Sequence, residues 1–466
     1  MSVPANYPSA LDKSKKVKWI ISLIITCIIM FIPTNDTFTP SIRNFFAITL
    51  LFILVSAFDL LDNYIPSLFL PAAYIIFGVA SADIALASWL NELPWVMLSA
   101  FLLVNVVEKT GLLKRVAFWI IIRTGGTYNG ILWGIFIAGV ILNFFLPGGA
   151  IVPLIAMAYG ICVALELQGT KEAAGIMISS SIGAIMPTMF IYAPAFFGLV
   201  YNAAKGGVPD LPEVSYLELI GRNIIYLPFL IILVFLTSKM FKPERGLQGK
   251  DYFTKEYKNL GKLSNPENRA FLVVLAIVVY LVTMNIHHRG MGWGFMLAAV
   301  AMYLPGINLG TKEDIRNINM SVVLFAGSCL SIGTVATSLG IGTIVTNMVM
   351  PFLEGNGVVV FLIVVMIITF ILNFIMTPAA IMAILAAPLA QLALQLNVDV
   401  ITTLSVLNSA AYQIIFPYEH SSFLILFSFG LISSKHFMKF FGITSIIHFI
   451  YVLAIAIPVW SLLGML

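Results

Sequence analysis

Long apolar runs follow one another along almost the whole chain, and they restrict the fold to one that lies in lipid. A helix needs about 20 mostly apolar residues to cross a membrane. Of the 466 residues, 60% are apolar and only 10% are charged, whereas about 25% of a soluble domain is charged. We therefore expect an all-α polytopic membrane protein of about eleven transmembrane helices. The runs lie near residues 18–34, 43–60, 64–81, 93–108, 173–200, 217–238, 269–286, 291–305, 320–337, 401–430 and 441–464.

Two further apolar stretches, 128–165 and 357–395, fit a single crossing poorly. Each is too long for one span, and each contains a proline in its middle, Pro147 in the first and Pro378 in the second. A stretch that enters the membrane, breaks and returns to the same side produces this pattern. We expect each stretch to form a re-entrant hairpin.

The basic residues predict the orientation. With eleven spans and two hairpins, all the basic clusters fall on one side, and a bias of Lys and Arg marks the cytoplasmic side. The N-terminus is then cytoplasmic and the C-terminus extracytoplasmic, in a cell (plasma) membrane. The clusters are Lys13–Lys18, Lys109 to Arg123, the segment 239–269, and Lys435 with Lys439.

The chain contains an internal repeat. Residues Val140–Phe144 recur as Phe370–Phe374, 230 residues later, and a weaker match joins 98–111 with 324–340. The asparagine of each copy is followed 44 residues on by a proline, Pro187 after Asn143 and Pro417 after Asn373. Five spans and a hairpin per copy give an odd number of crossings, so the second copy must be inverted.

This repeat divides the chain into four parts. Residues 1–42 form a cytoplasmic segment and the first helix, 43–238 the first repeat, 239–268 a cytoplasmic linker, and 269–466 the second repeat. We expect a short interfacial helix at about 248–260 within the linker.

Breaks in membrane helices predict where a ligand binds. Backbone groups freed from a helix cannot face lipid, so protein, water, ion or substrate must satisfy them. A helix that begins after a break directs positive partial charge at its N-terminus, which suits an anion, and free carbonyls suit a small cation. The paired breaks at 143–149, 183–188, 373–378 and 413–422 are expected to form one site at mid-membrane, where the repeats meet. The alternative is that these prolines only kink helices.

These features resemble the divalent anion/sodium symporter family of the ion-transporter superfamily, over nearly the whole chain. The resemblance rests on Glu108-Lys-Thr-Gly111, Asn143 with Gly148-Gly149, and the Lys435-His-Phe-Met-Lys439 stretch before the last helix. It implies a homodimer with a scaffold and an elevator-like transport domain. In this family a Ser-Asn-Thr triplet at each hairpin tip holds substrate carboxylate and sodium. Here both triplets are replaced, by Leu142-Asn143-Phe144 and Leu372-Asn373-Phe374.

The expected substrate contacts cluster at the two hairpin tips and at the first broken helix. Each asparagine can present an amide to substrate, or it can bridge the hairpin tip structurally. Glycine lets a ligand approach the backbone closely. The predicted substrate-binding residues are Asn143, Pro147, Gly148, Gly149, Asn373, Thr377, Pro378 and Thr188.

The expected ion-coupling residues lie in the breaks of the two long helices. Ionisable groups at membrane depth are functional hypotheses by default. Glu419 beside His420 could bind a proton, bind a cation directly, or hold the break closed by pairing with a basic group. Serines inside membrane helices also bond their own backbone. The predicted ion-coupling residues are Ser180, Ser181, Gly183, Glu419, His420 and Ser421.

Together these observations predict a secondary carrier of small anions, di- or tricarboxylates, with sodium, a proton or a second anion as the coupled solute. The alternative substrates are an inorganic oxyanion and a less polar solute held by Phe144 and Phe374. The alternative class of protein is an anion channel. No sequence motif of an enzyme is recognisable, and Cys27, Cys162 and Cys329 have no metal-ligand spacing. We expect no catalytic residues, metal, organic cofactor or nucleic-acid partner; the partners are substrate, lipid and a second copy.

Overall fold

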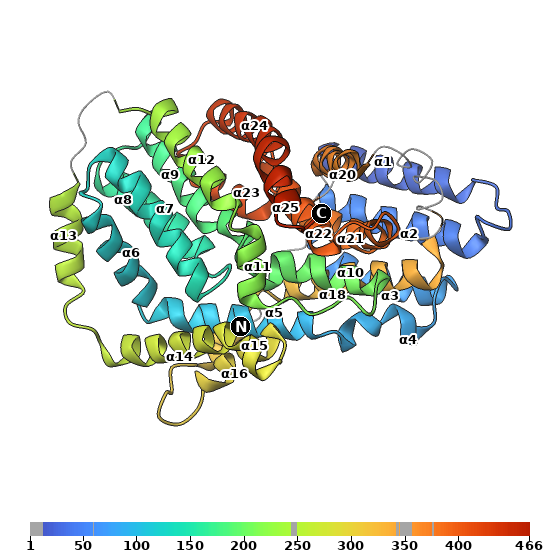
Figure 1. The fold of residues 1–466 in the computed structure, drawn as a ribbon, viewed down its shortest axis with the longest axis horizontal. Coiled ribbons are helices and arrows are strands. Elements are labelled where there is room, and N and C mark those ends of the chain that lie inside the picture. The colour runs from blue at the N-terminus through green and yellow to red at the C-terminus, as the bar shows by residue number, and fades with distance from the viewer. Residues whose placement is uncertain (1–12, 59, 244–248, 342–343, 345–356, 375–376) are drawn as a thin grey trace, which may run out of the picture.

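The computed structural model describes residues 13–58, 60–243, 249–341, 344, 357–374 and 377–466 (Figure 1). Within these ranges the regular structure is entirely helical. The first helix, α1 (Lys13–Met30), packs against α2 (Pro40–Ala57). The described part of the linker contains the short helix α13 (Lys250–Asn259) at the place the sequence predicts. The expectation of an all-α polytopic fold is therefore confirmed.

The helices of the first repeat follow one another from α2 to α12. After α2 come α3 (Tyr64–Ile76), α4 (Ala82–Ala85), η1 (Ala87–Leu90), α5 (Glu92–Lys109), α6 (Leu112–Arg123), α7 (Tyr128–Phe145), α8 (Ile151–Ala164), α9 (Lys171–Ala184), η2 (Met186–Met189), η3 (Pro194–Gly198), α10 (Leu199–Gly207), α11 (Tyr216–Asn223) and α12 (Tyr226–Met240).

The main helices of the second repeat follow the same order as those of the first, about 230 residues later. Its elements are α14 (Asn265–Val282), α15 (Met284–His287), α16 (Met291–Ala301), α17 (Lys312–Arg316), α18 (Met320–Ser338), α20 (Gly357–Asn373), α21 (Pro378–Gln395), α22 (Val400–Ala411), η4 (Pro417–Glu419), α23 (Ser421–Ser428), α24 (Ser434–Tyr451), η5 (Val452–Ala456) and α25 (Ile457–Leu462).

Helices of each repeat pack against helices of the other repeat in a reciprocal way. Helix α5 of the first repeat packs on α16 of the second, and α18 of the second packs on α3 of the first. The pairs are equivalent, because α3 corresponds to α16 and α5 to α18. This is the contact pattern that a pseudo-two-fold relation between repeats produces. Figure 1 shows α7, α8, α9 and α12 at one end of the molecule, α1 to α3 at the other, and α10, α18, α21 and α22 between them.

Several helices are shorter or more bent than continuous spans. By length and hydropathy, five helices in the described part of the chain can cross a membrane, and three bent pairs bring this to eight. The bends measure 66° between α5 and α6, 46° between α9–η2 and η3–α10, and 57° between α11 and α12. The last of these bends was not expected from the sequence. The number of eleven spans and the re-entrant course of the two hairpins stay predictions.

Ion pairs join segments that the predicted topology places on the same side of the membrane. Arg115 of α6 binds Glu267 at the start of α14 through Nε and Nη2, at 2.7 and 3.0 Å. Lys109 of α5 binds Asp314 of α17. On the opposite predicted side, Arg222 binds Asp399 at 3.1 Å. All three pairs connect the first repeat to the second half of the chain, at the start of α14, in α17 and at Asp399.

We expect the Lys109–Asp314 pair to make the fold sensitive to acid. Burial by itself raises the pKa of the Asp314 carboxyl, but the Lys109 ammonium and the hydrogen bonds from Thr311 outweigh it, so the net pKa lies below the ordinary 3.8. The unfolded chain then binds protons more readily than the folded one, so stability is full above about pH 4 and is lost as pH falls through the native pKa. Asp314→Asn is expected to cost roughly 1–3 kcal/mol at neutral pH and to reduce this acid sensitivity.

Thermal unfolding in detergent at a series of pH values measures both effects. Glu218→Gln is the control, because Glu218 is half-exposed and pairs with Arg222 only across one helical turn. Such surface pairs contribute about 0.3–0.5 kcal/mol. An acid sensitivity that is the same in Asp314→Asn and in the unchanged protein would contradict the prediction.

Candidate functional site

The tip of the first hairpin is tied to the broken helix α9 by Asn143. This side chain lies in the last turn of α7 and is fully buried. Its amide nitrogen donates to the carbonyls of Gly139, Gly183 and Ala184 at 2.9, 3.2 and 3.0 Å. Its amide oxygen accepts from the backbone N–H of Gly148 at 2.9 Å. Asn143 therefore satisfies carbonyls freed at the end of α9 and closes the tip at the same time.

The second hairpin repeats this bridge. Asn373, the last residue of α20, is buried and donates to the carbonyls of Ala410 and Gln413 at 3.3 and 3.1 Å. Gln413 follows Asn373 by 40 residues, just as Gly183 follows Asn143 by 40. The two repeats thus build the same link from hairpin tip to broken helix. The structural role that the sequence left open for the asparagines is present in both copies.

The two bridges differ at the amide oxygen. In the first repeat Gly148, at φ 77°, offers its N–H to Asn143. The residue 230 positions later is Pro378, which has no N–H to donate. Within the described residues, Oδ1 of Asn373 has no hydrogen-bond partner.

The remaining predicted tip residues cap and pack the hairpins. Thr377 is the N-cap of α21 and accepts from the N–H of Ala380 at 3.4 Å. Pro147 and Pro378 are buried. Gly149 is also buried, and a Cβ there would lie 2.7 Å from side-chain atoms of Leu146 and Val104. Its lack of a side chain therefore serves helix packing.

The two broken helices of opposite repeats meet directly. Thr188 of η2 donates its hydroxyl to the Ile185 carbonyl at 2.6 Å and accepts the hydroxyl of Tyr412 at 2.5 Å. Asn408 of α22 donates to the carbonyl of Thr188 at 3.3 Å. The break predicted at 183–188 therefore contacts the end of α22, directly before the break predicted at 413–422.

An aromatic cluster lies beside this contact. The ring of Phe196, in η3, lies 5.5 Å from that of Tyr412 and 6.1 Å from the imidazole of His420. His420 Nδ1 accepts from the N–H of Ser422 at 3.1 Å, so this residue also caps α23. Gly148 lies close to the same place, because a Cβ on it would be 3.9 Å from Phe196. His420 is thus brought to the junction of the repeats.

Glu419 faces the backbone of its own break. Its carboxylate accepts from the N–H groups of Ile415 and Phe416 at 3.0 and 3.1 Å, and the residue is 2% exposed. These are groups that the broken helix leaves without helical partners. Of the three alternatives for Glu419, none predicted this use of the carboxylate as a cap. The side chain of Ser421 lies outside the described residues.

The serines of α9 donate their hydroxyl protons to backbone carbonyls. Ser180 and Ser181 donate to the carbonyls three residues earlier in their own helix, each at 2.7 Å. Ser179 reaches across to the Leu132 carbonyl of α7, also at 2.7 Å. Gly183 lies against α7, where a Cβ would come within 2.8 Å of the Phe136 backbone. Because the hydroxyl protons of Ser180 and Ser181 are already donated, only the lone pairs of their oxygens could contact a coupling ion.

Three amide oxygens near these breaks have no hydrogen-bond partner among the described residues. They are Oδ1 of Asn373, Oδ1 of Asn408 and Oε1 of Gln413, all on buried side chains. Neutral oxygens of this type suit a small cation. Asn408 and Gln413 are not among the residues predicted from the sequence, because in the two long broken helices only ionisable and hydroxyl side chains were singled out. The available signal was the position of Gln413, 230 residues after Gly183.

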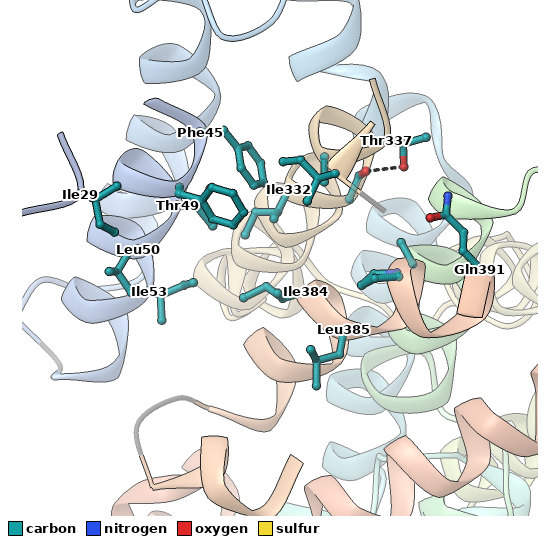
Figure 2. A pocket seen from close by; sticks show the side chains of 16 residues that line it. Ile29, Phe45, Thr49, Leu50, Ile53, Ile332, Thr337, Ile384, Leu385 and Gln391 are labelled. Carbon is teal, nitrogen blue, oxygen red and sulfur yellow. Dashed lines mark hydrogen bonds between the residues drawn. The ribbon is translucent and has the colours of Figure 1, made fainter. Parts of the chain in front are cut away.

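A separate cavity of about 280 Å³ lies between α1, α2, α18 and α21 (Figure 2). Its walls are mostly apolar, and its polar side chains have partners: Thr49 bonds Tyr74 at 2.6 Å, Thr337 bonds the Gly206 carbonyl at 2.7 Å, and Gln391 bonds the Gly207 carbonyl at 2.9 Å. An anion would find few polar groups there. We therefore place the functional site at the breaks.

Comparison with known proteins agrees with this geometry. A sequence model described as the sodium:sulfate symporter transmembrane region matches residues 13–466. The chain belongs to this family, the divalent anion/sodium symporters. It is accordingly a multi-pass membrane transporter with a small-molecule substrate, as the resemblance in the sequence implied.

One curated sequence and one solved structure illustrate what this chain is similar to. The "Putative malate transporter YflS" of Bacillus subtilis (strain 168) is 24% identical over 278 residues, which are 57% of this chain and 58% of the relative. The match thus spans little more than half of that protein. The crystal structure of the YdaH transporter of Alcanivorax borkumensis superposes with a TM-score of 0.57 over 97% of this chain and 98% of that one, at 13% identity. At this low sequence identity, the similarity to the second protein shows a shared fold.

Proposed function

We propose that this symporter-family chain carries small dicarboxylates or tricarboxylates across the plasma membrane by elevator-type alternating access, coupled to a small cation. The observation that carries the proposal is the paired bridge from each hairpin tip to a broken helix, with the two broken helices in contact at Thr188 and Tyr412. Such a constellation is the form that substrate and ion sites take in repeat-built transporters.

Helix N-termini supply the positive charge for an anion. Helix α8 begins at Ile151 and α21 at Pro378, each directly after a hairpin tip. Their free N–H groups and dipoles favour a carboxylate or another oxyanion. The name of the Bacillus relative favours malate and hence a dicarboxylate. The family description favours sulfate, so an inorganic oxyanion remains the second candidate.

Hydrogen bonds hold the hairpins and broken helices together as one unit. Asn143 and Asn373 join each hairpin to its own broken helix, and Tyr226 of α12 donates to Ser409 of α22 at 2.8 Å. The reciprocal contacts of α5 with α16 and of α18 with α3 form a second body. Movement of the first body against the second would expose the site alternately. We further propose a homodimer, with the N-terminus cytoplasmic and the C-terminus outside.

Counterflow in proteoliposomes tests the carrier. Vesicles loaded with unlabelled malate, succinate, citrate, sulfate or phosphate are given the labelled compound outside. We expect dicarboxylate inside to accelerate uptake of labelled dicarboxylate by about tenfold or more, which corresponds to roughly 1.4 kcal/mol. Uptake without acceleration by internal substrate would indicate a channel, and acceleration by sulfate alone would favour the inorganic candidate.

We expect Gln413→Leu to weaken cation dependence. The change removes one of the three unpartnered oxygens and the amide donor to the Ser409 carbonyl. The sodium concentration for half-maximal uptake should rise by about tenfold or more, on the scale of roughly 1.4 kcal/mol for one lost ligand. Uptake in sodium and in a large organic cation measures this. Gln391→Leu is the matched control, because Gln391 also donates to a backbone carbonyl but lines the remote apolar cavity. Equal effects of the two changes would argue against a cation at Gln413.

A further inference from the structure

A buried histidine on α24 takes no part in the site described above. His448 is fully buried, and within the described part of the chain neither of its ring nitrogens has a hydrogen-bond partner. The ring stacks on Tyr226 at 6.2 Å with an interplanar angle of 12°, and it meets Phe229 edge-on at 5.5 Å. Buried polar groups almost always have a partner, and ionisable residues at membrane depth are usually functional.

A second unpartnered side chain lies in the segment that packs against α24. Asn223 ends α11, is fully buried, and has no partner for either amide atom among the described residues. The break that follows it is bound to α24 and α25, because Tyr451 donates to the Ile225 carbonyl at 2.5 Å and Trp460 to the Arg222 carbonyl at 2.9 Å.

Charged groups are scarce around this histidine. The sequences of α12, α20, α22, α24 and α25 contain no acidic residue. The titratable residue recorded against the ring is Tyr226, whose hydroxyl donates to Ser409, and Tyr451 lies one helical turn further along α24 with its hydroxyl on the Ile225 carbonyl. The nearest charged side chain of α11, Arg222, binds Glu218 and Asp399. Among the described residues no negative charge is recorded against this ring, and a buried imidazolium without a partner is costly.

Both helices that enclose His448 are broken within about one turn of it. Helix α24 changes at Val452 into the π-helical turn η5, and the Val452 N–H still bonds the His448 carbonyl. Opposite, α11 and α12 meet at 57°. π-Helical turns inside helices occur frequently at functional sites. The surroundings of His448 are therefore ones that can rearrange.

Hydrogen bonds lead from this place to the second hairpin. Tyr226 donates to the Ser409 hydroxyl at 2.8 Å, and the Ser409 carbonyl accepts from Gln413 at 2.9 Å. The Gln413 carbonyl accepts from Asn373 at 3.1 Å. A change at the His448–Tyr226 stack can thus act on α22 and on the tip of α20.

We propose that His448 is a proton-binding site of the transport cycle, empty in this conformation and filled in one where the adjoining breaks admit water. This proposal rests on the proposed transport function. It adds a second coupled ion, a proton at His448, beside the cation proposed at the amide oxygens. The direction of the pH effect follows from linkage. A proton that binds only the water-accessible conformation shifts the population toward that conformation. Acid should therefore favour the other conformation and change the rate of net uptake.

Net uptake and counterflow of labelled malate, each measured between about pH 5 and 8, test the proposal. We expect net uptake to change by about fivefold or more over this range, with proton movement reported by internal pyranine. His448→Gln should reduce this change to less than about twofold and abolish the proton signal. His436→Gln, an exposed histidine in the first turn of the same helix, is the control. Tyr226→Phe keeps the imidazole but removes the bond to Ser409, so it should reduce the pH response of uptake by half or more.

The outcomes separate the two proposals. If the unchanged protein exchanges malate but shows no pH response, or if His448→Gln keeps the response, His448 is not the site. A purely structural role would lower uptake and counterflow together at every pH and leave their pH dependence intact. If no probe anion is exchanged, the transport proposal fails. Hydrogen–deuterium exchange of α24 in substrate-free protein then decides whether His448 binds a proton that changes the conformation. Acid should open α24 in the unchanged protein and not in His448→Gln.

Discussion

Gly139→Ala is expected to prevent this transporter from folding stably. Gly139 of α7 faces Gly183 of α9, and a Cβ on Gly139 would overlap the Gly183 carbonyl. A Cβ on Gly183 would in turn lie within 2.8 Å of the Phe136 backbone. Small residues let membrane helices approach closely, and here both partners in the collision are backbone, which cannot turn aside as a side chain can.

The close approach of α7 and α9 also sets the reach of Asn143. Its amide nitrogen lies 3.2 Å from the Gly183 carbonyl, so separating the helices would break the first hairpin bridge. Overpacking usually costs about 1–3 kcal/mol, and loss of buried hydrogen bonds adds about 1–3 kcal/mol more. We expect Gly139→Ala to be lost from the monodisperse fraction, or to melt at a clearly lower temperature.

Gly160→Ala is the matched control. Gly160 lies within the neighbouring helix α8, and a Cβ there would have no atom within 4 Å. Because alanine favours helix over glycine by up to about 1 kcal/mol, this variant should be as stable as the unchanged protein or more so. Size-exclusion profiles and thermal unfolding in the same detergent compare the two. Equal stability of Gly139→Ala and Gly160→Ala would show that α7 and α9 do not pack as described.

Asn143→Asp is expected to abolish transport, by about a hundredfold or more, which corresponds to roughly 2.7 kcal/mol. The carboxylate has no N–H, so the carbonyls of Gly139, Gly183 and Ala184 lose their donor and face a buried negative charge. An unpaired buried charge and unsatisfied backbone groups are both costly in a membrane interior.

Asn373→Asp provides the informative comparison. The Asn373→Asp variant also lacks the amide N–H groups that bond the carbonyls of Ala410 and Gln413. The amide oxygen of Asn373, however, has no hydrogen-bond partner among the described residues and lies near the proposed cation. A bound cation can offset the new charge. We expect a loss of only about tenfold, roughly 1.4 kcal/mol, that high sodium partly reverses. Counterflow at low and high sodium measures this. Equal losses in both variants, with no response to sodium, would contradict the difference between the two bridges.

The sequence by itself determined the class of the molecule and the positions of its breaks. Hydropathy needs no tertiary information, because lipid selects apolar helices wherever the segments lie. Proline and the paired asparagines located the hairpin tips and the broken helices, and all four breaks occur in the structure. The matched spacing of Asn143 and Asn373 further indicated that the two tips are equivalent.

Only the tertiary structure decided what each polar group contacts. The sequence could not indicate that Glu419 would take up the N–H groups of its own loop, or that Tyr412 would reach Thr188 across the repeat. His448 could not be singled out either, because a histidine within an apolar run resembles any other until its neighbours are known. Gln413 had only its position in the repeat, 230 residues after Gly183, to mark it. Hydrogen bonds are directional and act over about 3 Å, so the partner of a polar group is fixed only once the backbone is folded, whether that partner lies in the same loop, as for Glu419, or in the other repeat, as for Thr188.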